Sequence, residues 1–206
     1  MQRALRSISL LRITLLYAAV LLATNAWLES APSRTEARVL QATSTNLAHL
    51  GRDPWFVLPA SAFFTRGGLL IAIAGCLVCV GLLEIIAGWR VTLMVAAAGH
   101  IVGTLVSEGV EAVRLAAGDI PDSARRLLDV GPSYVLVACA VTVIAATDVD
   151  PRARLACAVA LAPVFVFTAW RLPAGRVDAI GHLTAALVGV VAALWLQRGR
   201  RVVTSG

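Results

Sequence analysis

A serine and a histidine lie near the starts of two apolar segments and could together form a catalytic pair. Ser133 stands in the sequence DVGPSYVLV, and His182 stands in VDAIGHLTAALVG. A serine hydroxyl becomes an effective nucleophile when a neutral imidazole within hydrogen-bond reach takes its proton. The two residues are therefore a candidate catalytic dyad. The alternative is structural, because serines and histidines in membrane helices commonly bond neighbouring helices.

The composition of the chain requires that the elements carrying these residues lie in a membrane. The chain has 206 residues, of which 59% are hydrophobic and 15% charged, and its mean hydropathy is +0.82. The 18 basic residues are all arginine and are scattered between apolar runs, which is typical of loops between spans rather than of a nucleic-acid groove. A chain of this length can supply roughly six helical spans. We therefore expect one all-α polytopic membrane domain over residues 1–206, in contact with membrane lipids and not with nucleic acid.

Six apolar segments are expected to form spans, and all 5 tryptophans fall near segment ends, where amphipathic rings suit the membrane interface. The predicted spans are 10–28, 67–87, 91–106, 130–147, 155–170 and 177–196. Segment 55–64 contains a proline and an adjacent arginine, and it is expected to lie at the membrane interface. A short helix is expected after Pro121, and the tail at 197–206 is expected in the cytoplasm.

The first apolar segment has two interpretations. Arg3 and Arg6 form a basic start, and Thr24-Asn25-Ala26 resembles a small-residue cleavage site, so the segment could be a signal peptide. Arg12 interrupts the early apolar run, and the run is long enough to cross a bilayer, which favours an uncleaved span.

The arginine-rich sequence QRGRR at 197–201 adjoins the end of the last span, which favours both termini in the cytoplasm. We expect the protein in a bacterial plasma membrane. With six antiparallel spans, the fourth and sixth both begin at the outer side, so Ser133 and His182 are expected at similar depth.

Other polar residues in apolar surroundings are candidate functional groups, because a charge inside a membrane is costly. Glu84 is expected to pair with Arg90 near the interface. His100 is expected either to bond another helix or to take part in the chemistry. Asp129 and Asp178 each precede a dyad residue by four positions, so each either orients its partner or marks the membrane interface.

Two further patterns complete the candidate residues. Gly181, Ala185 and Gly189 place a small residue at every fourth position, which favours close helix packing. The 4 cysteines, Cys76, Cys79, Cys139 and Cys157, all lie in apolar runs without a second metal-binding pair. We therefore expect no disulfide framework, no metal site and no cofactor.

The order of these motifs resembles the rhomboid intramembrane serine proteases. Gly131-Pro132-Ser133 and Gly181-His182-x-x-Ala185-x-x-x-Gly189 occupy the places of that family's serine and histidine motifs, one span apart. Phe63–Leu70 (FFTRGGLL) is similar to the segment that enters the second helix, and the likeness extends from Trp55 to Arg201. The resemblance implies a six-helix bundle with Ser133 as nucleophile and His182 as base, with Gly131 and His100 as candidate accessory or oxyanion residues.

The departures from the family pattern leave two hypotheses. Rhomboids usually carry a histidine and an asparagine on the second helix that help to form the oxyanion hole, and Ile71 and Gly75 stand at the corresponding positions. Pro132 removes an N–H group, and Tyr134 is bulky where the family has a small residue, so it is expected to crowd the sixth helix. The protein is thus either an intramembrane protease that cleaves transmembrane substrates or an inactive relative that binds membrane helices in quality control or trafficking.

Overall fold

A computed structural model describes the backbone of residues 11–204 and the side chains of residues 11–199. These residues form helices and connecting turns, without a β-strand among them. The prediction of an all-α membrane bundle is confirmed. Arg3, Arg6 and Leu10, which belong to the predicted start of the first span, lie outside the described residues, as do the last two residues of the predicted tail.

Five helical segments are long and apolar enough to cross a membrane. They are α2 (Arg12–Ser30), the segment Leu69–Ala87, α8 (Trp89–Ala116), the segment Pro151–Ala174 and the part Val177–Gly199 of α11 (Val177–Thr204). Segment Leu69–Ala87 consists of α6 (Leu69–Gly75), the π-helical turn η1 (Cys76–Val80) and α7 (Gly81–Ala87), and segment Pro151–Ala174 consists of α10 (Pro151–Arg171) and the 3₁₀ turn η3 (Leu172–Ala174).

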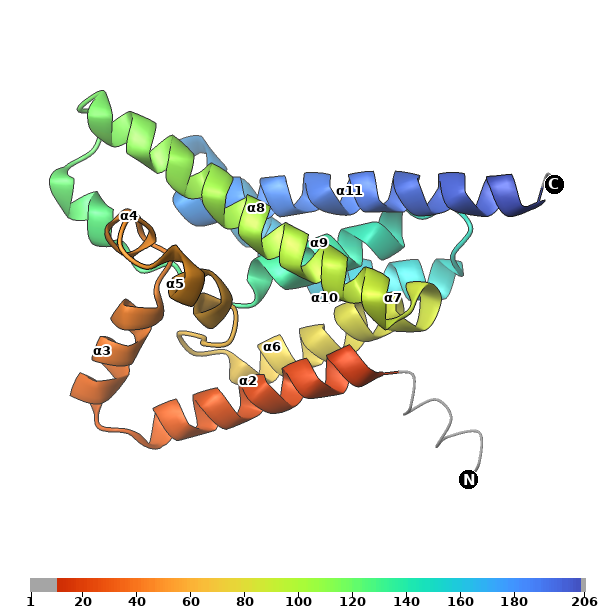
Figure 1. Ribbon diagram of the computed structural model, residues 1–206, viewed down its shortest axis with the longest axis horizontal. Helices are drawn as coiled ribbons and strands as arrows, with labels where there is room; N and C mark the ends of the chain where they lie inside the picture. The colour runs from red at the N-terminus through yellow and green to blue at the C-terminus, as the bar shows by residue number, and fades with distance from the viewer. Residues whose placement is uncertain (1–10, 205–206) are drawn as a thin grey trace.

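The remaining apolar helix, α9 (Ser133–Ala145), lies at the centre of the bundle (Figure 1). Its 13 residues span only about 20 Å, less than the thickness of an apolar membrane core. Every residue from Tyr134 to Val143 is buried, and α8, α10 and α11 pack around the helix. A helix enclosed by protein can be this short because its connecting backbone is shielded from lipid, and Pro132 and Ala146 at its two ends are buried.

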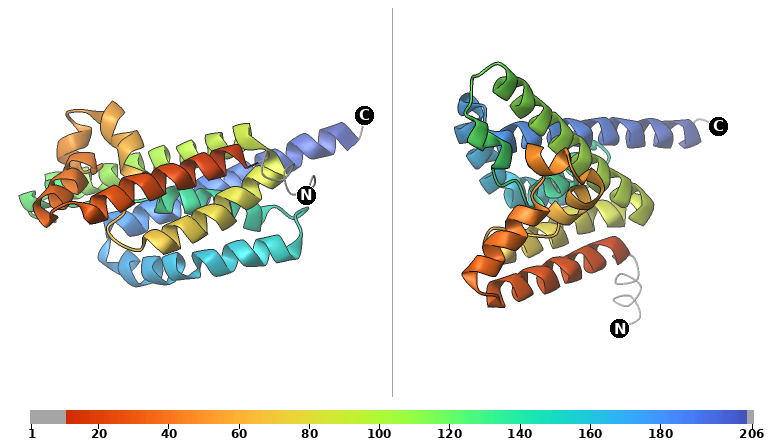
Figure 2. Two further views of the ribbon diagram at one scale, coloured as in Figure 1. Left: turned by 90° about the horizontal axis from the view of Figure 1, so that it is seen from below. Right: turned by 60° about the vertical axis from the view of Figure 1, so that its left-hand side comes forward.

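The bundle is antiparallel, and this arrangement fixes where the candidate dyad lies. The start of α2 and the end of α11 lie at one end of the bundle, whereas α9 and α11 both begin at the other end (Figure 1). Seen from below, α6 lies between α2 and α10 (Figure 2). The turn between α7 and α8 is the single residue Gly88, whose φ of 80° suits glycine. Ser133 and His182 therefore belong to the same end of the bundle.

The connection between α2 and α6 folds into three short helices at the dyad end: α3 (Ser33–Thr43), α4 (Leu47–Leu50) and α5 (Pro54–Ser61). The predicted interfacial segment 55–64 thus forms most of α5, with Trp55 87% exposed. The buried Asn25 side chain donates to the Phe63 carbonyl over 3.0 Å and accepts from the Thr65 N–H over 2.7 Å. These two bonds anchor the segment that leads into α6.

The prediction that Glu84 pairs with Arg90 is wrong. The buried Glu84 carboxylate accepts hydrogen bonds from the Ile13 and Thr14 N–H groups, both at 2.9 Å, and from the Thr14 hydroxyl at 2.7 Å. Arg90 instead lies over the Trp89 ring. The first N–H groups of a helix have no partner within the helix and carry partial positive charge, so a carboxylate stabilises them. Glu84 thus caps α2, which brings the first two spans together.

The third span extends beyond its predicted end at Val106, since α8 continues to Ala116. The residues that read as a polar connection, Ser107, Glu108 and Glu111, are buried. They follow Gly103 and Thr104 at spacings of three and four, which places them on one face of the helix, toward the bundle. After α8 the chain forms the 3₁₀ turn η2 (Asp122–Arg126), near the helix expected after Pro121.

Candidate functional site

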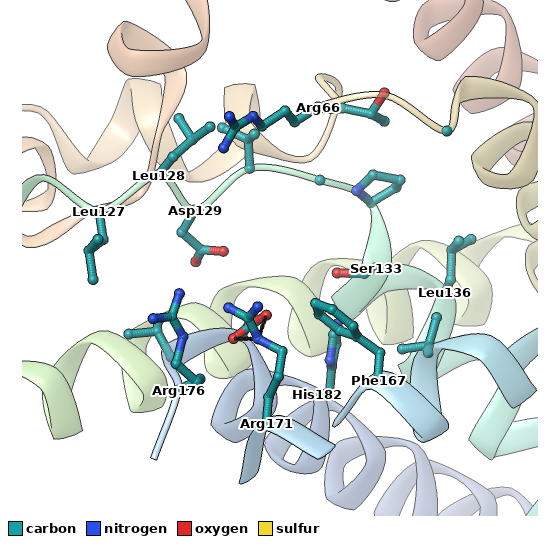
Figure 3. A pocket seen from close by; sticks show the side chains of 18 of the residues that line it. Arg66, Leu127, Leu128, Asp129, Ser133, Leu136, Phe167, Arg171, Arg176 and His182 are labelled. Carbon is teal, nitrogen blue, oxygen red and sulfur yellow. Dashed lines mark hydrogen bonds and ion pairs between the residues drawn. The ribbon is translucent and has the colours of Figure 1, made fainter. Parts of the chain in front are cut away.

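A cavity of about 900 Å³ lies at the end of the bundle where α9 and α11 begin. Both candidate dyad residues, Ser133 and His182, line this cavity. Its walls also come from α6, α10, the end of α8 and the loop before α9. Figure 3 shows side chains of the loop before α9, of α9, of α10 and of α11 around a common space. The structure therefore brings the serine and the histidine, which lie one span apart in the sequence, to one cavity.

Ser133 is the first residue of α9, and the loop before it is tied to the rest of the fold. Gly131 has a φ of 141°, and its N–H donates to the Ser61 carbonyl over 2.9 Å. Ser133 is partly buried, and its side chain lies at the cavity wall (Figure 3). Among the described residues the Ser133 hydroxyl has no hydrogen-bond partner, so it does not bond to His182 in this arrangement.

His182 lies on α11 with only 4% of its surface exposed. Its Nδ1 is 2.8 Å from the Thr168 hydroxyl of α10, and its Nε2 is buried without a hydrogen-bond partner among the described residues. The Tyr134 ring packs edge-on against the imidazole, with 5.3 Å between the ring centres. Two neighbouring helices thus hold the imidazole and leave one ring nitrogen free.

The room for Tyr134 comes from glycines on the helices that flank it. A Cβ on Gly181 would overlap the Tyr134 ring, and a Cβ on Gly103 of α8 would lie 3.3 Å from Tyr134 Cδ2. The expected crowding of the sixth helix is therefore absent, because glycine stands where the ring needs space. Farther along α11, Ala185 is fully buried, and a Cβ on Gly189 would lie 2.7 Å from the Ala138 carbonyl oxygen. The small residues of α11 face α9.

The structure does not bring His100 to the cavity. Its Nε2 lies 2.8 Å from the Leu58 carbonyl oxygen and 3.0 Å from the Ser61 hydroxyl, both on α5. A carbonyl oxygen can only accept, so Nε2 carries the proton. His100 thus connects α8 to α5, and it is not among the residues that line the cavity.

Asp129 and Asp178 line the cavity but bond to neither dyad residue. The Asp129 carboxylate accepts a hydrogen bond from the Thr45 hydroxyl at 3.2 Å. Burial raises the pKa of this carboxyl to about 6, although the Thr45 hydrogen bond lowers it in part. Asp178 forms an ion pair of 2.9 Å with Arg171 (Figure 3). The two carboxylates hold the loop before α9 and the turn before α11 in place.

The positions where rhomboids carry oxyanion donors, Ile71 and Gly75, both line the cavity and offer no side-chain donor. Backbone N–H groups at the start of α9 are alternative donors. Ser133, Tyr134 and Val135 begin α9, no side chain caps the helix, and their N–H groups have no backbone partner among the described residues. These N–H groups are the available stabilisers for negative charge beside Ser133.

Sequence reasoning missed Thr168 as a partner of His182. Thr168 is the single hydroxyl residue in the apolar run 155–170. An isolated hydroxyl in a span indicates a polar partner on a neighbouring helix. Sequence reasoning also missed that the lining includes Thr65, Arg66 and Gly67 rather than segment 55–64. In the part of the chain that the structure describes, no group of three or more His, Cys, Asp or Glu side chains could hold a metal ion.

A comparison with known families identifies the class of protein. A family model described as rhomboid-like protein matches residues 9–203, which is nearly the whole chain. The chain therefore belongs to the rhomboid-like protein family. No curated protein and no solved structure matches the chain.

Proposed function

We propose that this rhomboid-like protein is an intramembrane serine protease that cleaves transmembrane substrates. The observation that carries the proposal is the shared cavity: Ser133 and a histidine with a free Nε2, His182, both line it. Ser133 is the nucleophile, and His182 is the general base and then the general acid. The missing Ser133–His182 bond is compatible with this role, because catalytic hydrogen bonds are often long before substrate binds.

The reaction has two halves, acylation and deacylation, and in each half one proton passes through His182. As the Ser133 oxygen attacks the scissile carbonyl carbon, its proton passes to His182 Nε2. The oxygen of the tetrahedral intermediate takes up negative charge, and we assign to it the N–H groups of Ser133 and Tyr134, which have no hydrogen-bond partner among the described residues. The imidazolium then protonates the leaving amine, the C–N bond breaks, and an acyl-enzyme forms. Water then attacks the acyl carbon as its proton passes to the same imidazole. The bond between the acyl carbon and the Ser133 oxygen breaks, the acid product leaves, and the imidazolium returns a proton to that oxygen.

The substrate enters between α6 and α10. Ile71 of α6 and Phe167 of α10 both line the cavity, and both are also exposed, by 69% and 43%. Large apolar side chains on the outside of a membrane bundle face lipid, so an opening between them admits a peptide from the bilayer rather than from water. The Phe167 ring lies beneath the Arg171 guanidinium at 4.6 Å, and both residues line the cavity.

We infer that both termini face the cytoplasm of a bacterial plasma membrane. The shared position of the start of α2 and the end of α11, together with the arginines at 198–201, supports this orientation. The cavity then opens near the outer surface.

A second function has its own supporting observation. Ile71 and Gly75 supply no oxyanion donor from α6, and the loss of one such donor typically costs about 10²–10³ in rate. The alternative is a non-cleaving relative that uses the same cavity to bind membrane helices in quality control or trafficking.

A serine-reactive fluorophosphonate probe separates the two functions. For a protease, the purified wild-type protein is labelled, and Ser133→Ala and His182→Ala abolish labelling. Ser61→Ala is the matched control, because Ser61 also lies beside a histidine, and this variant keeps its labelling. Cleavage of a model transmembrane substrate in liposomes should follow the same pattern. Absence of labelling and cleavage in the wild type, or equal labelling of all four proteins, would reject the protease and favour the binding protein.

A further inference from the structure

The Thr168 hydroxyl sits between a carbonyl and the imidazole of His182. Thr168 Oγ1 is 2.7 Å from the Val164 carbonyl oxygen and 2.8 Å from His182 Nδ1, and Thr168 is 4% exposed. A hydroxyl has one proton and two lone pairs, and a carbonyl oxygen can only accept. The Thr168 proton is therefore donated to Val164.

The position of the Thr168 proton decides which ring nitrogen of neutral His182 carries its hydrogen. Since Thr168 donates to the carbonyl, its oxygen can only accept from the imidazole, and His182 Nδ1 must carry the ring hydrogen. A neutral imidazole has one N–H group, so Nε2 keeps its lone pair. This is the nitrogen that has no partner among the described residues. The lone pair is thus available on the ring nitrogen that a base requires.

His100 is held in the opposite tautomer, with the hydrogen on Nε2. Its Nε2 donates to the Leu58 carbonyl at 2.8 Å, so its lone pair is on Nδ1. The Ser61 hydroxyl, at 3.0 Å from the same Nε2, therefore faces a donor and not a base. This explains why the closer of the two serine–histidine pairs is structural. A short distance between the residues is insufficient without the correct tautomer.

We propose that Thr168 is a positioning residue that holds His182 in the Nδ1–H tautomer, so that Nε2 can take the proton of Ser133. The catalytic part of this inference rests on the proposed protease, whereas the tautomer itself does not. Thr168 does not line the cavity, so it acts only through His182. A valine keeps the branched shape of threonine and removes the acceptor, and a serine keeps the hydroxyl.

The tautomer can be measured without any activity. The chain contains 3 histidines, so ¹⁵N-histidine labelling of the detergent-solubilised protein gives few imidazole signals, and His49→Gln and His100→Gln assign them. At a pH of about 8, where imidazole is ordinarily neutral, wild-type His182 is expected as Nδ1–H and His100 as Nε2–H. Thr168→Val should shift His182 toward a mixture of tautomers, and Thr168→Ser should retain the wild-type state.

The control is Thr92→Val, because Thr92 is fully buried and, among the described residues, its hydroxyl donates to the carbonyl of Gly88, the residue just before α8. It should leave the His182 signals unchanged, which separates a specific effect from general loosening. An Nε2–H tautomer of His182 in the wild type, or an unchanged tautomer in a folded Thr168→Val, would overturn the inference.

Kinetics test the catalytic consequence. Thr168→Val should lower kcat about tenfold, the effect of losing one neutral hydrogen bond to the base, with KM unchanged. Thr168→Ser should restore most of kcat. A kcat in Thr168→Val equal to that of Thr92→Val would overturn the catalytic part. Wild-type protein without any activity would reject the protease, while the tautomer measurement would still decide the role of Thr168.

Discussion

Replacing Gly181 by alanine should disturb the contact that places His182 beside α9. The added Cβ would lie 2.5 Å from Tyr134 Cε1 and closer still to Cζ and Oη. Carbon atoms in favourable contact are about 3.5–4.0 Å apart, so either the ring or the helix must withdraw by about 1 Å. The ring has little freedom, because it is 3% exposed and also lies against Gly103 of α8.

The expected loss of stability follows from two opposing effects. Overpacking of a well-packed core costs about 1–3 kcal/mol, and this overlap belongs at the upper end because the Tyr134 ring is buried among neighbouring helices. Alanine is favoured over glycine in a helix by about 1 kcal/mol. The net destabilisation from Gly181→Ala should therefore be about 2 kcal/mol.

Reversible unfolding in mixed micelles with increasing SDS, followed by tryptophan fluorescence, measures this change. Gly109→Ala is the matched control, because Gly109 lies on the exposed face of α8 with no atom within 4 Å of an added Cβ. It should be neutral or slightly stabilising. In a Tyr134→Leu background the cost of Gly181→Ala should largely disappear, since the side chains then no longer overlap. Equal effects of the two alanine variants, or the same destabilisation in both backgrounds, would show that overlap with the Tyr134 ring is not the cause.

Three further predictions concern groups that fix the ends of helices. Glu84→Ala should destabilise the protein by about 2–3 kcal/mol in the same unfolding assay, because the N-terminus of α2 loses a charged partner of three hydrogen bonds, while Glu84→Gln should cost less. Burial raises the pKa of the Asp129 carboxyl from 3.8 to about 6. Between these two pH values the folded protein keeps a proton on Asp129 that the unfolded chain releases. The contribution of Asp129 to the free energy of unfolding should therefore fall as pH rises from about 4 to 6. Asp129→Asn should remove that component from the pH profile. Arg114→Met should cost about 1–2 kcal/mol and increase proteolysis at the turn before α11, because the guanidinium donates to the Gly175 carbonyl over 2.6 Å.

Each of these predictions has a result that contradicts it. Unchanged unfolding of Glu84→Ala would mean that the cap contributes nothing to stability. A pH profile of Asp129→Asn identical to that of the wild type would exclude a raised pKa as the cause of the slope. Unaltered proteolysis in Arg114→Met would show that the turn is held by other contacts.

Much of the fold could be predicted from the sequence, because the relevant signals are local. Long apolar runs located the helices, and the glycine in the predicted turn, Gly88, separates α7 from α8 as a single residue with positive φ. The end of α8 was less predictable. Glu108 and Glu111 interrupt the apolar pattern, but their spacing keeps them on the buried face, so the helix continues to Ala116.

The pairings of polar side chains could not be predicted in the same way. Arg90 is near Glu84 in the sequence, yet the partner of the carboxylate is Thr14, 70 residues away. Asp178 stands one helical turn before His182, yet it pairs with Arg171, and Thr168 of the preceding helix reaches the imidazole instead. Such choices depend on which helix faces lie together, and spacing along one helix does not contain that information.

The apolar segments of the chain are enough to identify a helical membrane protein, and the few polar residues within them are enough to single out Ser133 and His182. That follows because transfer into a bilayer depends on the composition of each segment, and every backbone polar group there must be satisfied within a helix. The packing of the helices is needed to show that Ser133 and His182 line one cavity, and that His182 has a free Nε2 whereas His100 does not. The physical reason is that a ring nitrogen donates or accepts according to the neighbour that the packing of other helices brings to it.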